Sequence, residues 1–278
     1  MRLSRRGFVG RTLGIATLSR VVHGDPLSMP IGTQVYPVRE SLGKDFEGTL
    51  QKLASTGYRT IEMCSPQGYG GALFGPLAGM TATQMRDRIG AAGLRCESCH
   101  YTFKELKDSL PERIAYAREL GLKQMILSSF GIREGALADW ARSAGELNRI
   151  AEQVHKAGMQ AGFHNHDGEF KQIDGVLIYD KLMSELDPGL VKMQYQMAVG
   201  RLGFDAPELF QKYPGRFISL HLQDWSAADK KMTPIGKGAV DWKKLFAAAK
   251  KAGVKNYFVE VEPALMQESY TYLHALKV

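Results

Sequence analysis

The 278-residue chain has no run of about 18 apolar residues, the length an ordinary membrane-spanning helix needs. It has only three cysteines, an odd number, so a disulfide framework is not indicated. No G-x-G-x-x-G follows the first apolar, β-branched run, which excludes the usual dinucleotide-binding motif. A dense Lys/Arg cluster interleaved with aromatic residues is also missing. Nucleic acid is therefore not an expected partner, and neither is stable membrane anchoring.

Positive charge is concentrated at the start of the chain. The net charge is +7, but five arginines and one aspartate fall within residues 1–26, and without them it drops to +3. The stretch "SRRGFV" (4–9) resembles a twin-arginine export signal, which predicts a periplasmic or exported protein. Against this, Arg20 interrupts the apolar segment and no clear A-x-A site follows, so a basic disordered tail on a cytoplasmic protein is the alternative. We assign residues 1–27 to this segment and 28–278 to one folded domain.

Apolar, β-branched runs alternate with longer amphipathic runs along the rest of the chain. Five helical runs end in a glycine just before an apolar run, as in "STGY", "KAGM" and "KAGV", which is typical of a helix that leads into a strand. The expected strands are 31–36, 58–63, 93–101, 123–129, 159–166, 190–197, 217–222 and 255–262. The expected helices are 44–56, 81–91, 109–119, 135–157, 175–186, 205–213, 240–252 and 264–276. This alternation predicts a single-domain (β/α)₈ barrel of the α/β class, with an open doubly wound sheet as the alternative.

Active groups of such a barrel gather where the strands end. The polar residues at the expected strand ends are Glu62, His100, His164, His166, Glu169, Gln194, Gln196, His221, Gln223, Glu260 and Glu262. Carboxylates and imidazoles that converge in this way suit a divalent cation such as Zn²⁺, Mn²⁺ or Co²⁺. A cation can polarise a carbonyl, and a nearby Glu can then remove the adjacent proton. The pattern indicates isomerisation or epimerisation beside a keto group.

Four stretches resemble the sugar phosphate isomerase/epimerase family, the xylose-isomerase-like TIM barrels. They are "GFHNHDGEF" (162–170), "YPGRFISLHLQDW" (213–225), the segment from "GKGAVDW" to "FVEVEP" (236–263), and the opening "IGTQVYPVRE" to "YRTIEM" (31–63). They are similar to the family's Y-H-N-H-x-x-E-F, K-Y-P-G-R-F-x-x-x-H-x-K-D, G-x-G-x-x-D-F … V-E, and I-G-x-Q-L-Y-x-V-R … V-E patterns. The resemblance covers residues 30–275.

The resemblance implies a divalent metal, with Mn, Zn, Co and Mg all open, and roles for individual residues. The implied metal ligands are Glu169, Gln196, His221 and Glu260. The implied catalytic residues are Glu169, Glu260 and His100, and the implied substrate contacts are Glu62, His164, His166, Gln223 and Trp225. His164 and His166 are alternatives to Glu169 on the fifth strand, and Tyr36 and Phe103 are further candidates for an apolar wall beside a sugar ring.

Two positions depart from the family pattern. Gln196 stands where the family has Asp, and Gln223 stands where Lys is usual. A neutral amide is a weaker ligand for a hard cation than a carboxylate, so metal affinity should fall unless another group compensates. Loss of the Lys removes a cation that would attract phosphate, which favours a non-phosphorylated or keto sugar.

The leading interpretation is a metal-dependent sugar isomerase or epimerase that acts on a small carbohydrate. A 3-keto-glycoside lyase or hydratase would use the same enolate chemistry. The two glutamines also leave open a sugar-binding barrel without catalysis. Phosphodiester cleavage would need more metal ligands and a basic surface, neither of which the sequence shows.

The stretch "CESCH" (96–100) matches the C-x-x-C-H pattern of covalent haem attachment. It lies inside an expected strand, where Cys96, Ser98 and His100 face one way while Glu97 and Cys99 face the other. Splitting the two thiols across the strand disfavours both haem attachment and a redox pair. No haem is expected, and His100 is the residue that reaches the barrel mouth.

Overall fold

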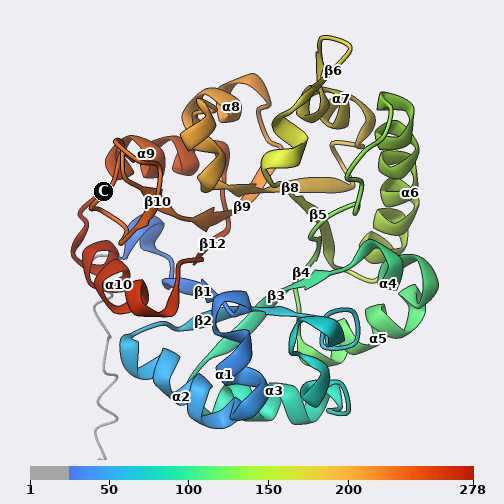
Figure 1. The fold of residues 1–278 in the computed structure, drawn as a ribbon. Coiled ribbons are helices and arrows are strands. Elements are labelled where there is room, and N and C mark those ends of the chain that lie inside the picture. The colour runs from blue at the N-terminus through green and yellow to red at the C-terminus, as the bar shows by residue number, and fades with distance from the viewer. Residues whose placement is uncertain (1–24) are drawn as a thin grey trace, which may run out of the picture.

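The computed structural model describes residues 25–278, and its centre is a closed barrel of eight parallel strands in the order β1-β12-β9-β8-β5-β4-β3-β2 (Figure 1). The barrel strands are β1 (Gly32–Gln34), β2 (Thr60–Cys64), β3 (Arg95–Tyr101), β4 (Gln124–Leu127), β5 (Gln160–His164), β8 (Val191–Gln196), β9 (Phe217–Leu222) and β12 (Asn256–Val259). Each lies within or overlaps an expected strand. The (β/α)₈ barrel predicted from the sequence is confirmed.

Helices form a ring outside the strands (Figure 1). They are α1 (Arg39–Lys44), α2 (Phe46–Thr56), α3 (Ala82–Ala91), α4 (Phe103–Asp108), α5 (Leu110–Leu120), α6 (Leu137–Lys156), α7 (Ile178–Glu185), α8 (Ala206–Lys212), α9 (Trp242–Ala252) and α10 (Met266–Ala275). Short 3₁₀ turns are η1 (Pro26–Ser28), η2 (Tyr36–Val38), η3 (Gly70–Ala72), η4 (Gly75–Leu77), η5 (Asp167–Phe170), η6 (Met197–Leu202) and η7 (Pro263–Leu265). None of the helices within residues 25–278 is long and apolar enough to cross a membrane.

Helix ends follow local capping chemistry. The Asp45 carboxylate accepts a hydrogen bond from the Gly48 N–H and so begins α2, and Asp241 does the same for α9 through Lys244. Gly121 and Gly253 follow α5 and α9 with φ of 89° and 78°, the left-handed conformation that ends a helix before the next strand. These glycines are among those from which the sequence predicted the helix–strand junctions.

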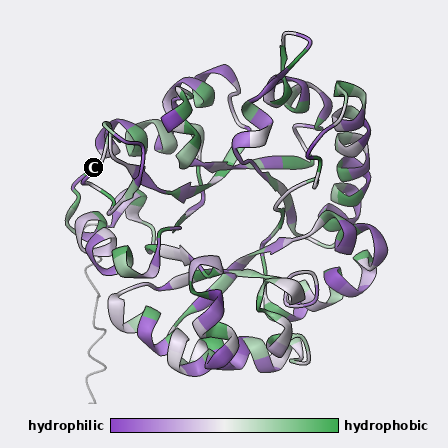
Figure 2. Cartoon of the chain, in the orientation of Figure 1, coloured by the Kyte–Doolittle hydropathy of each residue, from purple (hydrophilic) through white to green (hydrophobic). Residues whose placement is uncertain are grey.

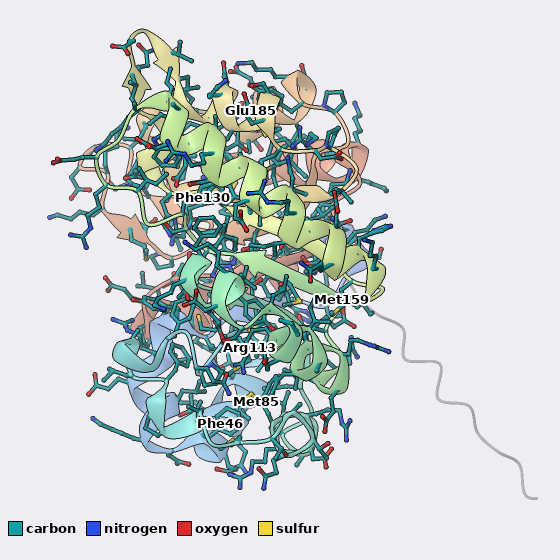
Figure 3. The ribbon with its side chains drawn as sticks, turned by 90° about the vertical axis from the view of Figure 1, so that its right-hand side faces the viewer. Phe46, Met85, Arg113, Phe130, Met159 and Glu185 are labelled. Carbon is teal, nitrogen blue, oxygen red and sulfur yellow. The ribbon has the colours of Figure 1, made fainter. Side chains whose placement is uncertain are left out.

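The apolar core lies between the barrel and the helices. Helical ribbons in Figure 2 change from hydrophobic to hydrophilic around their circumference, as expected for helices with one buried face. Phe130 lies beside the long helix α6 (Figure 3). It stacks on Phe163 of β5 with ring centroids 4.7 Å apart and meets Trp140 of α6 edge-on. This packing fixes the strand from which the histidines of β5 project.

Several short elements were not predicted. They are helices α1 and α4, the hairpin of β6 (Gln172–Ile173) with β7 (Val176–Leu177), and the hairpin of β10 (Asp224–Trp225) with β11 (Met232–Thr233). Two-residue strands carry no readable alternation, so periodicity does not reveal them.

Residues 25–29 pack against the barrel. The Tyr257 hydroxyl donates to the Pro26 and Met29 carbonyl oxygens at 3.0 and 3.1 Å, and Asp25 lies 2.8 Å from His274. The twin-arginine stretch lies outside the described residues.

The strand pairing shifts register at two places that bear on the site. One lies between Ile61 and Glu62, where β2 pairs with β3, and the other between Met193 and Gln194, where β8 pairs with β9. After these shifts Glu62 stands level with Ser98 and Gln194 with Ser219. Bulges of this kind re-aim side chains, and both occur where the polar layer of the barrel begins.

Candidate active site

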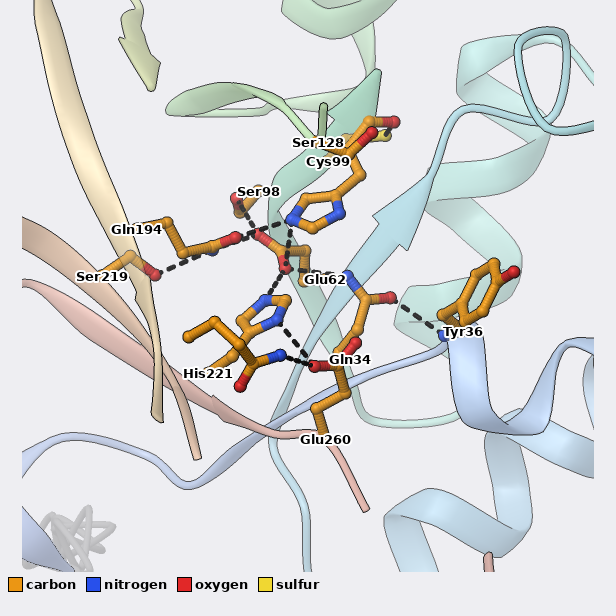
Figure 4. Close-up of polar contacts among 12 residues, drawn as sticks. Gln34, Tyr36, Glu62, Ser98, Cys99, Ser128, Gln194, Ser219, His221 and Glu260 are labelled. Atoms are coloured by element: carbon orange, nitrogen blue, oxygen red, sulfur yellow. Dashed lines mark hydrogen bonds and ion pairs between the residues drawn. The ribbon is translucent and has the colours of Figure 1, made fainter. Parts of the chain in front are cut away.

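A buried carboxylate, that of Glu62 on β2, lies at the bottom of the site. It accepts hydrogen bonds from Gln34 Nε2 at 2.8 Å, Gln194 Nε2 at 2.7 Å and Ser98 Oγ at 2.5 Å, and His221 Nε2 lies 2.5 Å away (Figure 4). Burial alone would raise the pKa of Glu62, but electrostatic interaction with the imidazoles of His100 and His221 and these bonds lower it to about 2. The carboxylate is therefore ionised, and it is 0% exposed.

Three imidazoles lie above this carboxylate. His100 of β3, His164 of β5 and His221 of β9 bring ring nitrogens within 4.8 Å of one another, and all three are buried. The His164 and His221 rings are 4.3 Å apart, and the His100 and His221 rings stack at 5.1 Å. His166 meets His164 edge-on at 4.8 Å. Residues from three separate strands thus form one cluster.

One ring nitrogen of His164 has no partner among residues 25–278. Its Nδ1 is buried there without a hydrogen bond, which is costly unless something else binds. Burial, together with the positive charge of His221, lowers the pKa of His164 well below its usual value. The ring is therefore neutral near pH 7 and offers a lone pair.

Glu260, at the end of β12, is held by three donors. Its Oε2 accepts from Gln196 Nε2 at 2.5 Å and from Gln223 Nε2 at 3.1 Å, and His221 Nδ1 lies 3.2 Å away. Burial would raise the pKa of Glu260, but the His221 charge and the bonds from His221 and Gln196 lower it. Its side chain is 16% exposed, so this ionised carboxylate is partly accessible.

A cavity of about 540 Å³ opens above these groups at the barrel mouth. It brings together six of the residues predicted from the sequence: His100, His164, His166, Gln196, Gln223 and Glu260. Burial lowers the pKa of His100 and of His166, so both imidazoles tend to be neutral. A volume of this size lies in the range of about 300–1,000 Å³ common for small-molecule sites.

Four predicted site residues do not line this cavity. Glu62 lies beneath the histidines, as described, and His221, which contacts Glu62, is itself 0% exposed. Glu169, on η5, is 3% exposed, and its carboxylate accepts the His166 N–H at 2.8 Å instead of facing the histidines. Trp225 lines a separate cavity of about 410 Å³ with Phe204 and Lys230.

Other residues of the site were not assigned a role from the sequence. Gln34 links Glu62 to the cavity wall, Ser98 and Ser219 complete the buried network, and Arg39 and Tyr69 line the cavity. Ser98 was recognisable, because it lies two residues before His100 on the same face of a strand. Gln34 stands at the Q of the family-like opening sequence.

The donor set fits a divalent cation. Three imidazoles have nitrogens within 4.8 Å of one another, and the Nδ1 of one of them has no partner in the described part of the chain. Such a group suits metals that favour nitrogen ligands. The ionised Glu62 behind His221 is the kind of carboxylate that orients a ligating imidazole. The geometry therefore favours His164 over Glu169 as the ligand from β5.

The family model described as "Xylose isomerase-like TIM barrel" matches residues 50–273, and the chain belongs to this family. A structure described as a sugar phosphate isomerase/epimerase from Parabacteroides distasonis ATCC 8503 superposes with a TM-score of 0.75 at 24% identity, covering 88% of this chain and 93% of that one. The "probable 3-DHS dehydratase AsbF" from Bacillus anthracis superposes with a TM-score of 0.68 at 12% identity, covering 88% and 98%. At these identities the similarity shows the fold.

Sequence similarity extends to inosose dehydratases. The Lacticaseibacillus casei protein is 26% identical over 149 residues, which are 45% of this chain and 49% of that protein. The Geobacillus thermodenitrificans protein is 26% identical over 200 residues, 59% of this chain and 66% of that protein. The chain thus spans about half the length of the first of these curated relatives.

Proposed function

We propose that the protein is a carbohydrate-modifying enzyme that removes a proton next to a carbonyl of a non-phosphorylated sugar and then expels the substituent on the next carbon, the reaction of a lyase or dehydratase. The observation that carries the proposal is the ionised Glu260, held at the cavity wall beside three buried imidazoles. A positioned carboxylate of this kind is a suitable general base.

In the proposed reaction, Glu260 takes the proton from the carbon beside the carbonyl, and the electron pair moves toward the carbonyl oxygen. When the carbonyl re-forms, the bond to the oxygen substituent on the next carbon breaks. That oxygen leaves as water or an alcohol with a proton from the imidazolium form of His166, which lines the cavity, and the proton that Glu260 took up then restores this form. A divalent cation, when bound, supplies polarisation of the carbonyl, and His100, His164 and His221 are the residues that would hold it.

His100 changes its proposed role. The sequence assigned it to catalysis, but its Nε2 is engaged with Gln194 Oε1 at 2.6 Å and lies 3.3 Å from Glu62. These contacts orient the ring within the histidine cluster, which favours a metal-binding role. His166 has no such polar partner for its ring within the described chain and takes the place of the proton donor.

An isomerase or epimerase is the second candidate, and it was the leading expectation from the sequence. Epimerisation needs a proton acceptor on one face of the sugar and a donor on the other. Glu169 would have been the second carboxylate, but it is bonded to the His166 backbone and does not line the cavity. Two carboxylates line the cavity, Glu260 and Glu262, and it is Glu260 that contacts the histidine cluster through His221. This pairing of a carboxylate with imidazoles supports elimination better than a two-carboxylate exchange. The partial similarity to inosose dehydratases supports the same choice.

The test is incubation in D₂O with a panel of free sugars and 3-keto-glycosides, followed by NMR and mass spectrometry. We expect an unsaturated product or its hydrate from a keto sugar, and loss of turnover in Glu260→Gln. Deuterium uptake with inversion and no elimination product would favour an epimerase. No exchange and no product with any keto sugar would contradict the proposed chemistry.

We also propose export across the inner membrane, on the basis of Arg5 and Arg6 in the stretch "SRRGFV". Cell fractionation of the full chain should find it in the periplasm, and the variant with both arginines changed to lysine should stay inside. Equal distribution of the two proteins would favour a cytoplasmic enzyme.

A further inference from the structure

The cavity is lined by groups of different chemistry, with His100, His164 and Glu260 on one hand and Tyr36 and Tyr69 on the other. Figure 4 shows Tyr36 set apart from His221 and Glu260, and we call its side of the cavity the aromatic end. At about 540 Å³, the cavity lies in the range of about 300–1,000 Å³ that holds drug-sized ligands, which are larger than one sugar ring. A reacting ring at the histidines would leave the aromatic end open.

Tyr36 is an exposed aromatic residue beside a polar site. Its side chain is 37% exposed, while the neighbouring Phe74 is fully buried. The Tyr36 ring packs on Phe74 at 6.4 Å and meets Tyr69 at 6.3 Å, so its inner side is supported while part of its surface remains open. An exposed aromatic surface at a cavity edge suits the apolar face of a sugar ring.

Arg39 stabilises this surface. Its guanidinium lies 4.3 Å from the Tyr36 ring centroid, and its Nη1 donates to the Tyr36 carbonyl oxygen at 2.8 Å. Arg39 also lines the cavity and makes no ion pair with the described residues. Its remaining N–H groups are therefore available to hydroxyl oxygens.

A hydrogen-bond chain ties the aromatic end to the reacting end. The Tyr36 N–H donates to Gln34 Oε1 at 3.0 Å, and Gln34 Nε2 donates to Glu62, which contacts His221 (Figure 4). The spacing between Tyr36 and the histidine cluster is thus fixed by bonded contacts. A fixed spacing allows one ligand to be recognised at both ends.

We propose that Tyr36 and Arg39 form a platform for a second sugar ring, and that the substrate is a neutral glycoside of at least two rings. This rests on the proposed function, which places the reacting ring at Glu260. The cavity wall carries Glu260 and Glu262 against the single guanidinium of Arg39, which disfavours a polyanionic ligand. The ring on the platform is the part that leaves as an alcohol on elimination.

Isothermal titration of the full chain with matched sugars tests the platform without requiring turnover. The pairs are methyl β-D-glucopyranoside with cellobiose and methyl α-D-glucopyranoside with maltose. We expect one disaccharide to bind about three- to tenfold more tightly than its methyl glycoside, the size of an aromatic packing contribution. Tyr36→Ala should abolish this preference by weakening disaccharide binding more than methyl glycoside binding, and Tyr36→Phe should keep it.

Leu202→Ala is the control for loss of an exposed apolar side chain, since Leu202 is 49% exposed and does not line this cavity. Equal binding of both members of each pair by the unmodified protein, or binding of none, overturns the proposal. So does a Tyr36→Ala protein that weakens both members equally. If the disaccharide preference depends on Tyr36 but no keto sugar exchanges deuterium, the platform is confirmed and only the proposed chemistry is contradicted.

Discussion

His221 Nε2 lies 2.5 Å from Glu62 Oε2, although neither side chain is exposed to solvent. The other ring nitrogen of His221 faces Glu260, which does reach the cavity. The imidazole therefore connects a carboxylate inside the barrel with one at its mouth. Burial alone would lower the pKa of His221, but Glu260 and Glu62 raise it to about 10. In the absence of a cation, the one positive charge of His221 is shared between the two carboxylates and leaves one negative charge, which a bound cation would offset.

The first prediction concerns Glu62→Gln. The change leaves His221 without its buried counter-charge and removes the acceptor that orients the ring. We expect the apparent Kd for Zn²⁺ to rise about 10- to 100-fold, the range for loss of a carboxylate behind a metal-binding histidine. The free energy of unfolding should fall by about 3–5 kcal/mol, as for a broken buried ion pair. Metal titration and urea unfolding measure the two effects.

Glu47→Gln is the matched control, because Glu47 pairs with Arg88 on the surface and exposed pairs contribute about 0–1 kcal/mol. Unchanged Zn²⁺ affinity in a folded Glu62→Gln protein would show that Glu62 has no role in the metal site.

The second prediction concerns Glu169→Gln. Burial raises the pKa of Glu169 from 4.5 to about 7. Because the folded-state value is the higher one, its contribution to stability is fully present below pH 4.5 and is lost as pH rises through about 7. The unmodified protein should lose about 3 kcal/mol of unfolding free energy across this window from this group. A Gln at 169 can still accept the His166 N–H and does not titrate, so the variant should lack this loss and be the more stable protein at pH 8.

Urea unfolding at pH 5, 6, 7 and 8 checks this, with exposed Glu268→Gln as control. The same variant decides between the two candidate ligands from β5. We expect unchanged metal stoichiometry for Glu169→Gln and loss of metal for His164→Ala. Loss of metal in Glu169→Gln would instead show that Glu169 is a ligand, as expected from the sequence.

The barrel was predictable, because each helix–strand junction carries its own local signal. A glycine after a helix and an alternation of apolar residues are signals that span only a few positions, so the helices and strands can be predicted from the sequence. His100, Gln196 and Glu260 were found for the same reason, since they end strands whose direction the barrel fixes. The family resemblance added the prediction of which strands contribute metal ligands.

The positions of Glu169 and Trp225 were not predictable. Both follow a strand that has already ended, β5 at His164 and β9 at Leu222, so strand alternation no longer says where they point. Glu169 lies on a 3₁₀ turn and bonds to the His166 backbone, and Trp225 lies on the β10–β11 hairpin. Such placements depend on contacts made only once the fold is complete.

The third prediction concerns the two glutamines that replace the family's Asp and Lys. Both amides donate to the same oxygen of Glu260, and the two replacements together leave the net charge unchanged. Gln196→Asp should add a hard oxygen ligand and place a second negative charge beside Glu260. We expect the Kd for Mn²⁺ to fall by at least about tenfold relative to that for Zn²⁺, because hard cations prefer carboxylates.

Competition titration of Mn²⁺ against Zn²⁺ measures this preference, and Gln196→Asp with Gln223→Lys restores the net charge as a control. The double variant should keep the altered preference. If the ratio of the Kd for Mn²⁺ to the Kd for Zn²⁺ is unchanged in both variants, residue 196 does not contact the metal.

The fourth prediction concerns Gly238, in the loop that follows the β10–β11 hairpin. The buried Asp224 carboxylate accepts the N–H groups of Gly236 and Gly238 at 2.9 and 3.1 Å and the Trp242 Nε1–H at 3.0 Å. A Cβ at position 238 would come within 2.1 Å of Asp224 Oδ1, so Gly238→Ala must displace the carboxylate from its donors. Since a hydrogen bond to a charged group contributes about 1.5–3 kcal/mol, we expect a loss of at least about 2 kcal/mol on urea unfolding.

Gly79→Ala is the matched control, because a Cβ at Gly79 meets no atom within 4 Å and Gly79 has no positive φ. It should change the free energy of unfolding by less than about 1 kcal/mol in either direction. The hairpin also brings Met232 to the wall of the cavity at the barrel mouth, so Gly238→Ala should weaken sugar binding in the titration used for Tyr36. Equal stability of the two alanine variants would mean that the loop moves away from Asp224 at little cost, and that the five donors around this carboxylate do not hold the hairpin in place.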